Sequence, residues 1–212
     1  MEFDFEAMSA ARRFEFLTGT VVPRPIALVT TLTPEGTPNA APYSFFNIMG
    51  IDPPVVAFTV LPAADGRMKD TGVNILATRD FVVNLVSEAL AEAMNVTCID
   101  APPGIDELRL AGIATTPSTI VAPPRIAASP VAFECRLHES VALGPGQAIL
   151  IGRVLHAHVQ DAAVIDAERC LFDTPALGLI ASLHGARWYL RGTDRFAMDR
   201  PSWAEWMAQG RV

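Results

Sequence analysis

Residues 26–47 read IALVTTLTPEGTPNAAPYSFFN and carry the clearest strand and turn signals of the chain. The first part, Ile26–Leu32, is rich in β-branched side chains and predicts a strand. The next part, Thr33–Asn39, holds the Pro and Gly residues typical of a turn. We therefore expect a second strand over Ala40–Asn47, paired with the first in an antiparallel hairpin.

Further strands and turns follow along the chain. Because hairpins outnumber crossover helices, the pattern predicts a mainly β fold, an antiparallel barrel rather than a parallel sheet. The other expected strands are Val55–Val60, Phe81–Val86, Val131–Leu143, Ala148–Val159 and Arg187–Leu190, the third and fourth forming one long hairpin.

A few peripheral helices are expected around the barrel. Asp70 is a reasonable N-cap for one of them, and residues 98–130 should be irregular and rich in proline, with a helical turn near Ile105–Leu110. The expected helices are Glu6–Leu17, Asp70–Thr78 and Ser87–Val96, with a short helix or loop over Pro175–Leu183.

The length and composition of the chain limit the classes of protein to which it can belong. With 212 residues, the chain fits a single domain spanning 1–212. It is 50% hydrophobic and 18% charged, and its mean hydropathy is +0.30, yet no apolar run is long enough to cross a bilayer. We expect no membrane partner, and we expect the excess apolar surface to be buried between subunits.

Charge and cysteine usage exclude further classes. The net charge of −7 and the lack of basic runs argue against a nucleic-acid partner. The acidic N-terminus does not resemble a signal peptide. The three cysteines form no CxxC pair, and Cys98 and Cys135 are expected to be small buried residues. A cytoplasmic location is the natural expectation.

The motifs that are missing indicate a cofactor. The chain has no GxGxxG, P-loop or GxSxG motif, so a cofactor that brings its own reactivity would supply the chemistry. Asn39–Asn47 mixes aromatic, hydroxyl and amide groups, which suits a flat heteroaromatic ring. Arg67–Thr71 places two cations and a hydroxyl at an expected helix start, which suits a phosphate. A mononucleotide with a ring and one phosphate fits this order.

Taken together, these segments resemble the flavin-reductase-like family with an FMN-binding split barrel, which includes flavoredoxin-like proteins. The resemblance implies a six-stranded split β-barrel, a homodimer, FMN near the subunit interface, and reduction of flavin by NADH or NADPH, often for a partner monooxygenase. It is carried by Arg24–Thr31, Asn39–Asn47, Pro53–Phe58, Lys69–Thr71 with Asn74-Ile75, Phe81–Asn84, Leu183-His184-Gly185, Trp188-Tyr189, Arg195-Phe196 and Arg200-Pro201.

The resemblance also implies roles for single residues. Arg24 would close the site, Thr30 and Thr31 would meet the ribityl chain or the ring edge, and His184 would lie where nicotinamide could stack. A basic residue is expected just before Leu183, where this chain has Ala181-Ser182. The flavin ring would be lined by Ser44, Phe45, Phe46 and Asn47, and the phosphate held by Arg67, Lys69 and Thr71.

Alternatives stand beside this interpretation. Taken singly, Tyr43, Phe45 and Phe46 are most simply core residues. His138, His156 and His158 fit half-exposed strand positions better than a metal site, so no metal is predicted. Two other functions remain open: an FMN-binding electron carrier without its own NAD(P)H turnover, and a flavin-less structural or regulatory dimer.

Overall fold

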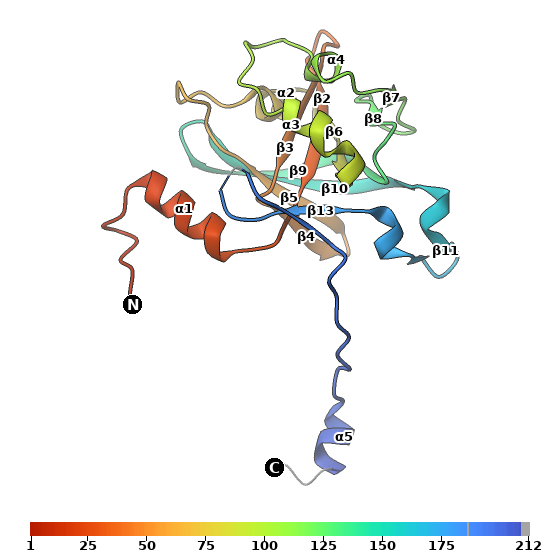
Figure 1. Ribbon diagram of the computed structural model, residues 1–212. Coiled ribbons are helices and arrows are strands. Elements are labelled where there is room, and N and C mark those ends of the chain that lie inside the picture. Colours follow the sequence, from red (N-terminus) through yellow and green to blue (C-terminus); the bar gives the residue numbers. More distant parts are fainter. Residues whose placement is uncertain (186, 209–212) are drawn as a thin grey trace.

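A seven-stranded antiparallel sheet forms the body of the computed structural model, which describes residues 1–185 and 187–208 (Figure 1). Its strand order is β3-β2-β6-β9-β10-β5-β4. The mainly β, antiparallel fold class is confirmed, with seven strands in this sheet instead of six. The strands are β2 (Ala27–Leu32), β3 (Pro38–Tyr43), β4 (Phe46–Ile51), β5 (Pro54–Val60), β6 (Asp80–Leu85), β9 (Val131–Gly144) and β10 (Gln147–Val159).

The sheet must curl into a barrel because its two edge strands are consecutive in the chain. In a flat sheet, six steps of about 4.8 Å would place β3 and β4 about 29 Å apart. The three Cα steps from Tyr43 to Phe46 can span only about 11 Å. A hydrogen bond from Thr59 N to Phe45 O (3.0 Å) ties the corner to β5. The predicted strand Ala40–Asn47 is therefore wrong as one element, since the chain turns at Ser44-Phe45.

Apolar side chains fill the inside of the curled sheet. Phe58 packs edge-on against Phe81, with ring centroids 5.8 Å apart, and Tyr43 packs on Phe58 at 4.9 Å. Leu150 and Val29 are fully buried in the same cluster. Residues from all seven strands of the sheet thus share one core, and Tyr43 is its last member before the corner between β3 and β4.

Helices and small sheets surround the barrel. The helices are α1 (Ala10–Thr20), α2 (Asp70–Thr78), α3 (Ala91–Val96), α4 (Glu107–Leu110) and α5 (Trp203–Ala208), with 3-10 turns at Glu88–Leu90, Asp161–Ala163 and Thr174–Leu177. β1 (Arg24–Pro25) pairs with β13 (Ile180–Ser182), which pairs with β14 (Tyr189–Arg191). The remaining pairs are β7 (Thr115–Thr116) with β8 (Arg125–Ile126) and β11 (Val164–Asp166) with β12 (Leu171–Phe172).

Several expected helix boundaries move for local reasons. The first helix begins at Ala10 instead of Glu6, because the Ser9 side chain caps it by accepting from Arg12 N. The helix expected over Ser87–Val96 divides into a 3-10 turn and α3. α5 lies well away from the body at the end of an extended arm (Figure 1).

Candidate functional site

Two adjoining cavities lie beside the corner that joins β3 to β4. Their volumes are about 420 Å³ and about 570 Å³. Because they share part of their lining, they form one elongated site with two compartments, here called the first and second cavity. The shared residues are Phe14, Pro42, Tyr43, Lys69 and Cys98.

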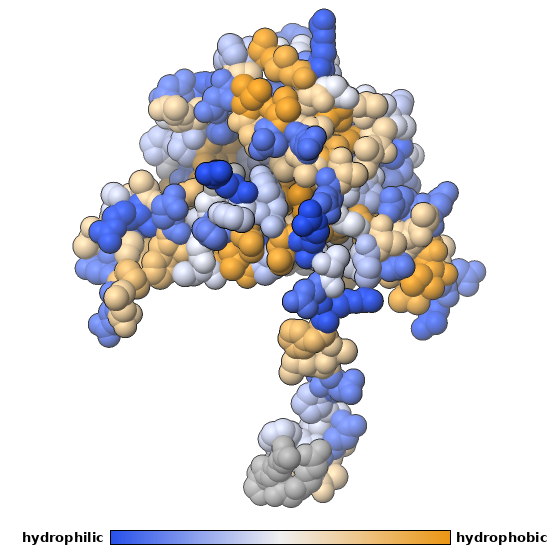
Figure 2. Space-filling view, in the orientation of Figure 1, coloured by the Kyte–Doolittle hydropathy of each residue, from blue (hydrophilic) through white to orange (hydrophobic). Residues whose placement is uncertain are grey.

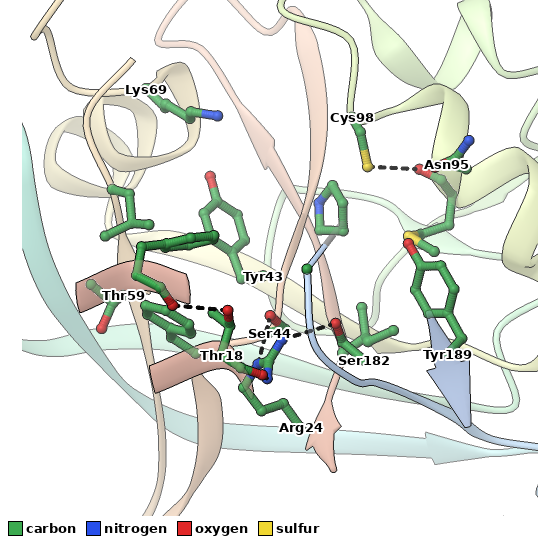
Figure 3. Close-up of a pocket in the computed structure, with 17 residues that line it drawn as sticks. Thr18, Arg24, Tyr43, Ser44, Thr59, Lys69, Asn95, Cys98, Ser182 and Tyr189 are labelled. Carbon is green, nitrogen blue, oxygen red and sulfur yellow. Dashed lines mark hydrogen bonds between the residues drawn. The ribbon is translucent and has the colours of Figure 1, made fainter. Parts of the chain in front are cut away.

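The first cavity combines aromatic rings with hydroxyl groups (Figure 3). This lining suits a flat heteroaromatic ligand, whose faces need apolar walls and whose edge atoms need hydrogen bonds. Its lining residues include the cations of Arg24 and Lys69 and no carboxylate. The aromatic members are Phe14, Tyr43, Phe45 and Tyr189, and the aliphatic hydroxyls belong to Thr18, Ser44, Thr59 and Ser182.

Arg24 connects three segments at the wall of the first cavity. Its Nε donates to Ser44 Oγ (3.3 Å), and its Nη2 donates to Ser182 Oγ (3.1 Å) and Leu183 O (2.6 Å). Its Nη1 donates to two carbonyl oxygens of α1 and its C-terminal cap, those of Thr18 (2.7 Å) and Val21 (3.0 Å). All five N–H groups are therefore engaged within the protein.

Tyr43 contributes an unsatisfied hydroxyl to the shared wall. Within the described residues, its Oη is the buried side-chain polar atom that lacks a hydrogen-bond partner. Burial raises the pKa of Tyr43, against a smaller opposing effect of the nearby Thr71 hydroxyl. The group therefore remains protonated, and its hydrogen is left without an acceptor among the described residues.

The second cavity brings together the three residues predicted to hold a phosphate. Arg67, Lys69 and Thr71 all line it. Thr71 lies in the first turn of α2, and its Oγ1 accepts a bond from Asn39 Nδ2 at 2.9 Å. Lys69 is the N-cap of this helix and makes no side-chain cap bond. The predicted grouping of two cations and a hydroxyl at a helix start is therefore present in the structure.

Carboxylates pair with those cations. Arg67 pairs with Asp65 (3.2 Å) and Asp70 (2.8 Å), while Lys69 Nζ lies 3.7 Å from Asp100. All of these ion pairs are solvent-accessible, so each contributes little to stability. A phosphate can therefore compete with these carboxylates for the same donors.

Asp70 does not cap α2 as predicted. It is the first helical residue, and its carboxylate accepts from Arg67 Nη1 and from Gly104 N (3.2 Å). The cap prediction is wrong because the backbone is already helical at Asp70 and is still extended at Lys69, which makes Lys69 the N-cap.

Four residues predicted at the flavin lie outside the lining of both cavities. Thr30 and Thr31 are completely buried. Thr30 Oγ1 donates to Pro124 O (2.6 Å), and Thr31 Oγ1 accepts from Asn74 Nδ2 (3.0 Å). Phe46 is a core residue of β4, and Asn47 is exposed, with its Oδ1 accepting from Ile48 N. Of the predicted ring segment, Ser44 and Phe45 line the first cavity.

His184 lies at the edge of the first cavity. Its side chain is exposed, and its ring stacks on Trp188 with centroids 6.2 Å apart. The next residue, Gly185, lines the cavity directly. Where the resemblance implies a basic residue, Ser182 instead accepts a hydrogen bond from Arg24.

Three lining residues have no site role predicted from the sequence. Asn95 and Cys98 reach the first cavity from the end of α3, and Tyr189, part of one motif of the resemblance, reaches it from β14. The expectation that Cys98 is buried is wrong, because the residue is exposed at the wall of both cavities. Only the tertiary fold brings these segments to the corner after Tyr43.

His156 and His158 of β10 make contacts within the protein. His158 Nε2 lies 2.6 Å from Glu134 Oε1, and the rings of His156 and His158 are 4.8 Å apart. No group of three or more potential ligands for a metal ion occurs within residues 1–185 and 187–208. Over the same residues, no helix has the length and apolar character needed to span a membrane.

This fold and site define a barrel that can hold an elongated ligand with a ring and an anionic group. Residues 18–172 match the family model described as "Flavin reductase like domain". The chain belongs to this family. A relative from Deinococcus radiodurans, named as an uncharacterized protein, is 43% identical over 211 residues, which cover 98% of this chain and 92% of the relative.

Two solved structures are similar over nearly the whole chain. Nitrilotriacetate monooxygenase component B from Bacillus cereus is 31% identical with a TM-score of 0.87, covering 93% of this chain and 98% of that one. The 2-nitrobenzoate 2-nitroreductase NbaA from Pseudomonas fluorescens is 34% identical with a TM-score of 0.87, covering 96% and 98%. The predicted split-barrel fold is confirmed, and the family and these neighbours support an oxidoreductase of the flavin reductase type.

Proposed function

We propose that this protein is a flavin reductase that binds FMN and oxidises NADH or NADPH. The observation that carries the proposal is the pair of adjoining cavities that share Lys69. One cavity is suited to a ring and the other to a single phosphate, in the order that a mononucleotide requires.

The residues have distinct tasks in this proposal. Ser44 and Phe45 line the ring, while Arg67, Lys69 and Thr71 hold the phosphate. The bound flavin supplies the hydride-accepting chemistry. The chain binds and orients the flavin and limits the access of water to one side of the first cavity. Because all donors of Arg24 are engaged within the protein, we assign it no direct bond to the flavin.

The nicotinamide would enter at the rim of the first cavity. Gly185 and Tyr189 line this side, and Gly185 itself has no side chain. The stacked rings of His184 and Trp188 provide a flat surface beside it. No essential general acid is required for this transfer, since the hydride passes between the two cofactors.

A monooxygenase is the partner that best fits the neighbours. The Bacillus cereus structure is named as a monooxygenase component B. By analogy, reduced flavin made here would serve a separate oxygenase. A second candidate is the direct reduction of a nitro compound by the bound flavin, favoured by the 34% identity to the nitroreductase NbaA.

We further propose a single-domain homodimer that works in the cytoplasm. The edge strand β4 carries three exposed apolar side chains, those of Ile48, Met49 and Ile51. Figure 2 shows apolar surface along the lower side of the body, the side on which Figure 1 places β4. A second copy is the occupant that fits this surface, because the strand is an edge of the sheet and leaves its large apolar side chains exposed.

An absorbance spectrum of the purified protein tests the cofactor, and NAD(P)H oxidation tests the reaction. We expect a yellow protein, or one that turns yellow with added FMN, and NADH or NADPH oxidation that depends on free flavin. Oxidation that depends instead on 2-nitrobenzoate would favour the second candidate. Bound FMN without any turnover would leave an electron carrier, and a protein that stays colourless after soaking in FMN would refute the flavin site.

A further inference from the structure

Arg24 is a buried cation without a negatively charged partner. Its side chain belongs to a residue only 6% exposed, and its five N–H groups all donate to neutral oxygens. No carboxylate within the described residues forms an ion pair with it. Burial lowers the pKa of Arg24, but a guanidinium has so high an ordinary pKa that it stays charged.

The charge of Arg24 acts on the first cavity with only partial compensation. The lining of that cavity contains a second cation, Lys69, and no Asp or Glu. Lys69 has one weak partner, since Asp100 lies 3.7 Å away and is largely exposed. The C-terminal carbonyl groups of α1 offset part of the Arg24 charge, equivalent to roughly half a negative charge for a helix end. A protein of net charge −7 therefore holds a locally positive cavity where the ring is placed.

We propose that Arg24 stabilises the reduced, anionic form of the flavin and thereby raises the midpoint potential of the bound cofactor. The inference rests on the function proposed above. Reduction adds two electrons to the ring, and uptake of a single proton from solvent leaves one negative charge on it. A buried cation at the cavity wall favours that charge over the neutral oxidised ring, since charges interact strongly where water is excluded.

Arg24 exerts this effect as a positioning residue and not through a bond to the ring. At the corner between β3 and β4, Arg24 contacts the side chain of Ser44, whose Oγ accepts a hydrogen bond from Arg24 Nε at 3.3 Å. Because the oxygen accepts from Arg24, the hydroxyl hydrogen of Ser44 is directed away from Nε and can donate to an electron-rich edge of the ring. Charge and oriented hydroxyl thus favour the same reduced state.

The test compares the affinities of oxidised and reduced FMN. We expect Arg24→Gln to weaken the binding of reduced FMN at least tenfold more than that of oxidised FMN. For a two-electron couple, tenfold corresponds to a fall of about 30 mV in the midpoint potential. Arg24→Lys keeps the charge and loses the fork of hydrogen bonds, so its affinity ratio should stay within about threefold of the wild type.

A matched control removes a cation elsewhere. Arg79 lines neither cavity and donates one bond to Leu137 O, so Arg79→Gln should leave the affinity ratio and the potential unchanged. Two results would overturn the charge effect. One is that Arg24→Gln weakens the binding of oxidised and reduced FMN equally. The other is that Arg24→Lys changes the ratio of the two affinities as much as Arg24→Gln does, and either result would leave Arg24 with a purely structural role.

The wild-type protein alone supplies a second readout. When the reduced ring changes from neutral to anionic with rising pH, the slope of the midpoint potential changes from about 59 to about 30 mV per pH unit, since one proton instead of two accompanies two electrons. We expect this change at least one pH unit lower for bound than for free FMN in the same buffer. The same pH for both would overturn the inference while leaving the flavin site intact, and failure to bind FMN at all would overturn both.

Discussion

At the scale of single residues, Lys69 is the cation that lines both cavities. It forms one weak, exposed contact with Asp100. A residue in this position can hold a phosphate where the first cavity meets the second. The contact with Asp100 must then be exchanged for the ligand.

Replacing Lys69 by Ala should weaken FMN binding at least tenfold and leave riboflavin binding nearly unchanged. A charge-assisted hydrogen bond to phosphate is worth about 1.5–3 kcal/mol, and riboflavin has no phosphate to lose. Fluorescence titration with both flavins measures the difference. The control is Asp100→Asn, which removes the competing carboxylate and should hold or tighten FMN affinity. An equal loss for both flavins would place the phosphate elsewhere.

Replacing Tyr43 by Phe should not destabilise the ligand-free protein. The buried hydroxyl lacks a partner, so its removal should leave the free energy of unfolding unchanged or raise it by about 1 kcal/mol. FMN affinity should fall roughly three- to tenfold if the ligand accepts this bond, a loss near 1 kcal/mol. Urea unfolding and FMN titration give the two numbers. A clear loss of ligand-free stability would mean that the hydroxyl is already bonded within the protein.

At the scale of secondary-structure elements, the local patterns were sufficient for the regular strands. The long hairpin was predicted as Val131–Leu143 and Ala148–Val159 and is found as β9 and β10. Its alternating side chains are a property of the segment itself. The break at Ser44-Phe45 depends instead on closure of the barrel, which no local pattern encodes.

The contrast between local pattern and tertiary structure also explains which predicted site residues line the cavities and which do not. Arg67, Lys69 and Thr71 lie together because a helix start orients them locally. Thr30 and Thr31 lie on a strand covered on both faces, and their hydroxyls bond to the covering segments. Their pattern in the sequence could not distinguish a buried strand from a ligand-lined one.

Glu134 shows how a covering segment is held on the barrel. This fully buried carboxylate on β9 accepts from Thr119 N (2.7 Å), Ile120 N (2.6 Å) and Val121 N (3.1 Å), and it contacts His158. Burial alone would raise the pKa of Glu134, but these donors together lower it to about 2.

The sign of this shift predicts an acid-sensitive fold. Because the folded-state pKa lies below the ordinary value of 4.5, the stabilisation is present above about pH 4.5 and is lost as the pH falls toward 2. It amounts to on the order of 3 kcal/mol. In Glu134→Gln, urea unfolding should show lower stability at pH 7 and a smaller decline across this window. Glu139→Gln, an exposed change on the same strand, should behave as the wild type. Equal pH dependence of all three proteins would contradict this role.

At the scale of the whole molecule, two features stand out on the described chain. One is the exposed apolar edge of β4, and the other is the arm that carries α5 away from the barrel (Figure 1). A long, apolar edge strand promotes association unless another surface covers it. Both features fit the proposed homodimer.

Charges placed on the β4 edge should separate the subunits. Met49 and Ile51 are 61% and 82% exposed, so Met49→Glu/Ile51→Glu should cost the isolated chain little stability. Sedimentation should then show a monomer where the wild type is a dimer, because like charges would meet in a desolvated interface. The matched control, Ile165→Glu/Leu171→Glu on the exposed β11-β12 pair, should remain dimeric. If the partner also closes the first cavity, the monomeric variant should bind FMN more weakly as well. A monomeric wild-type protein would contradict the homodimer. A dimer that persists in Met49→Glu/Ile51→Glu would place the interface on another surface.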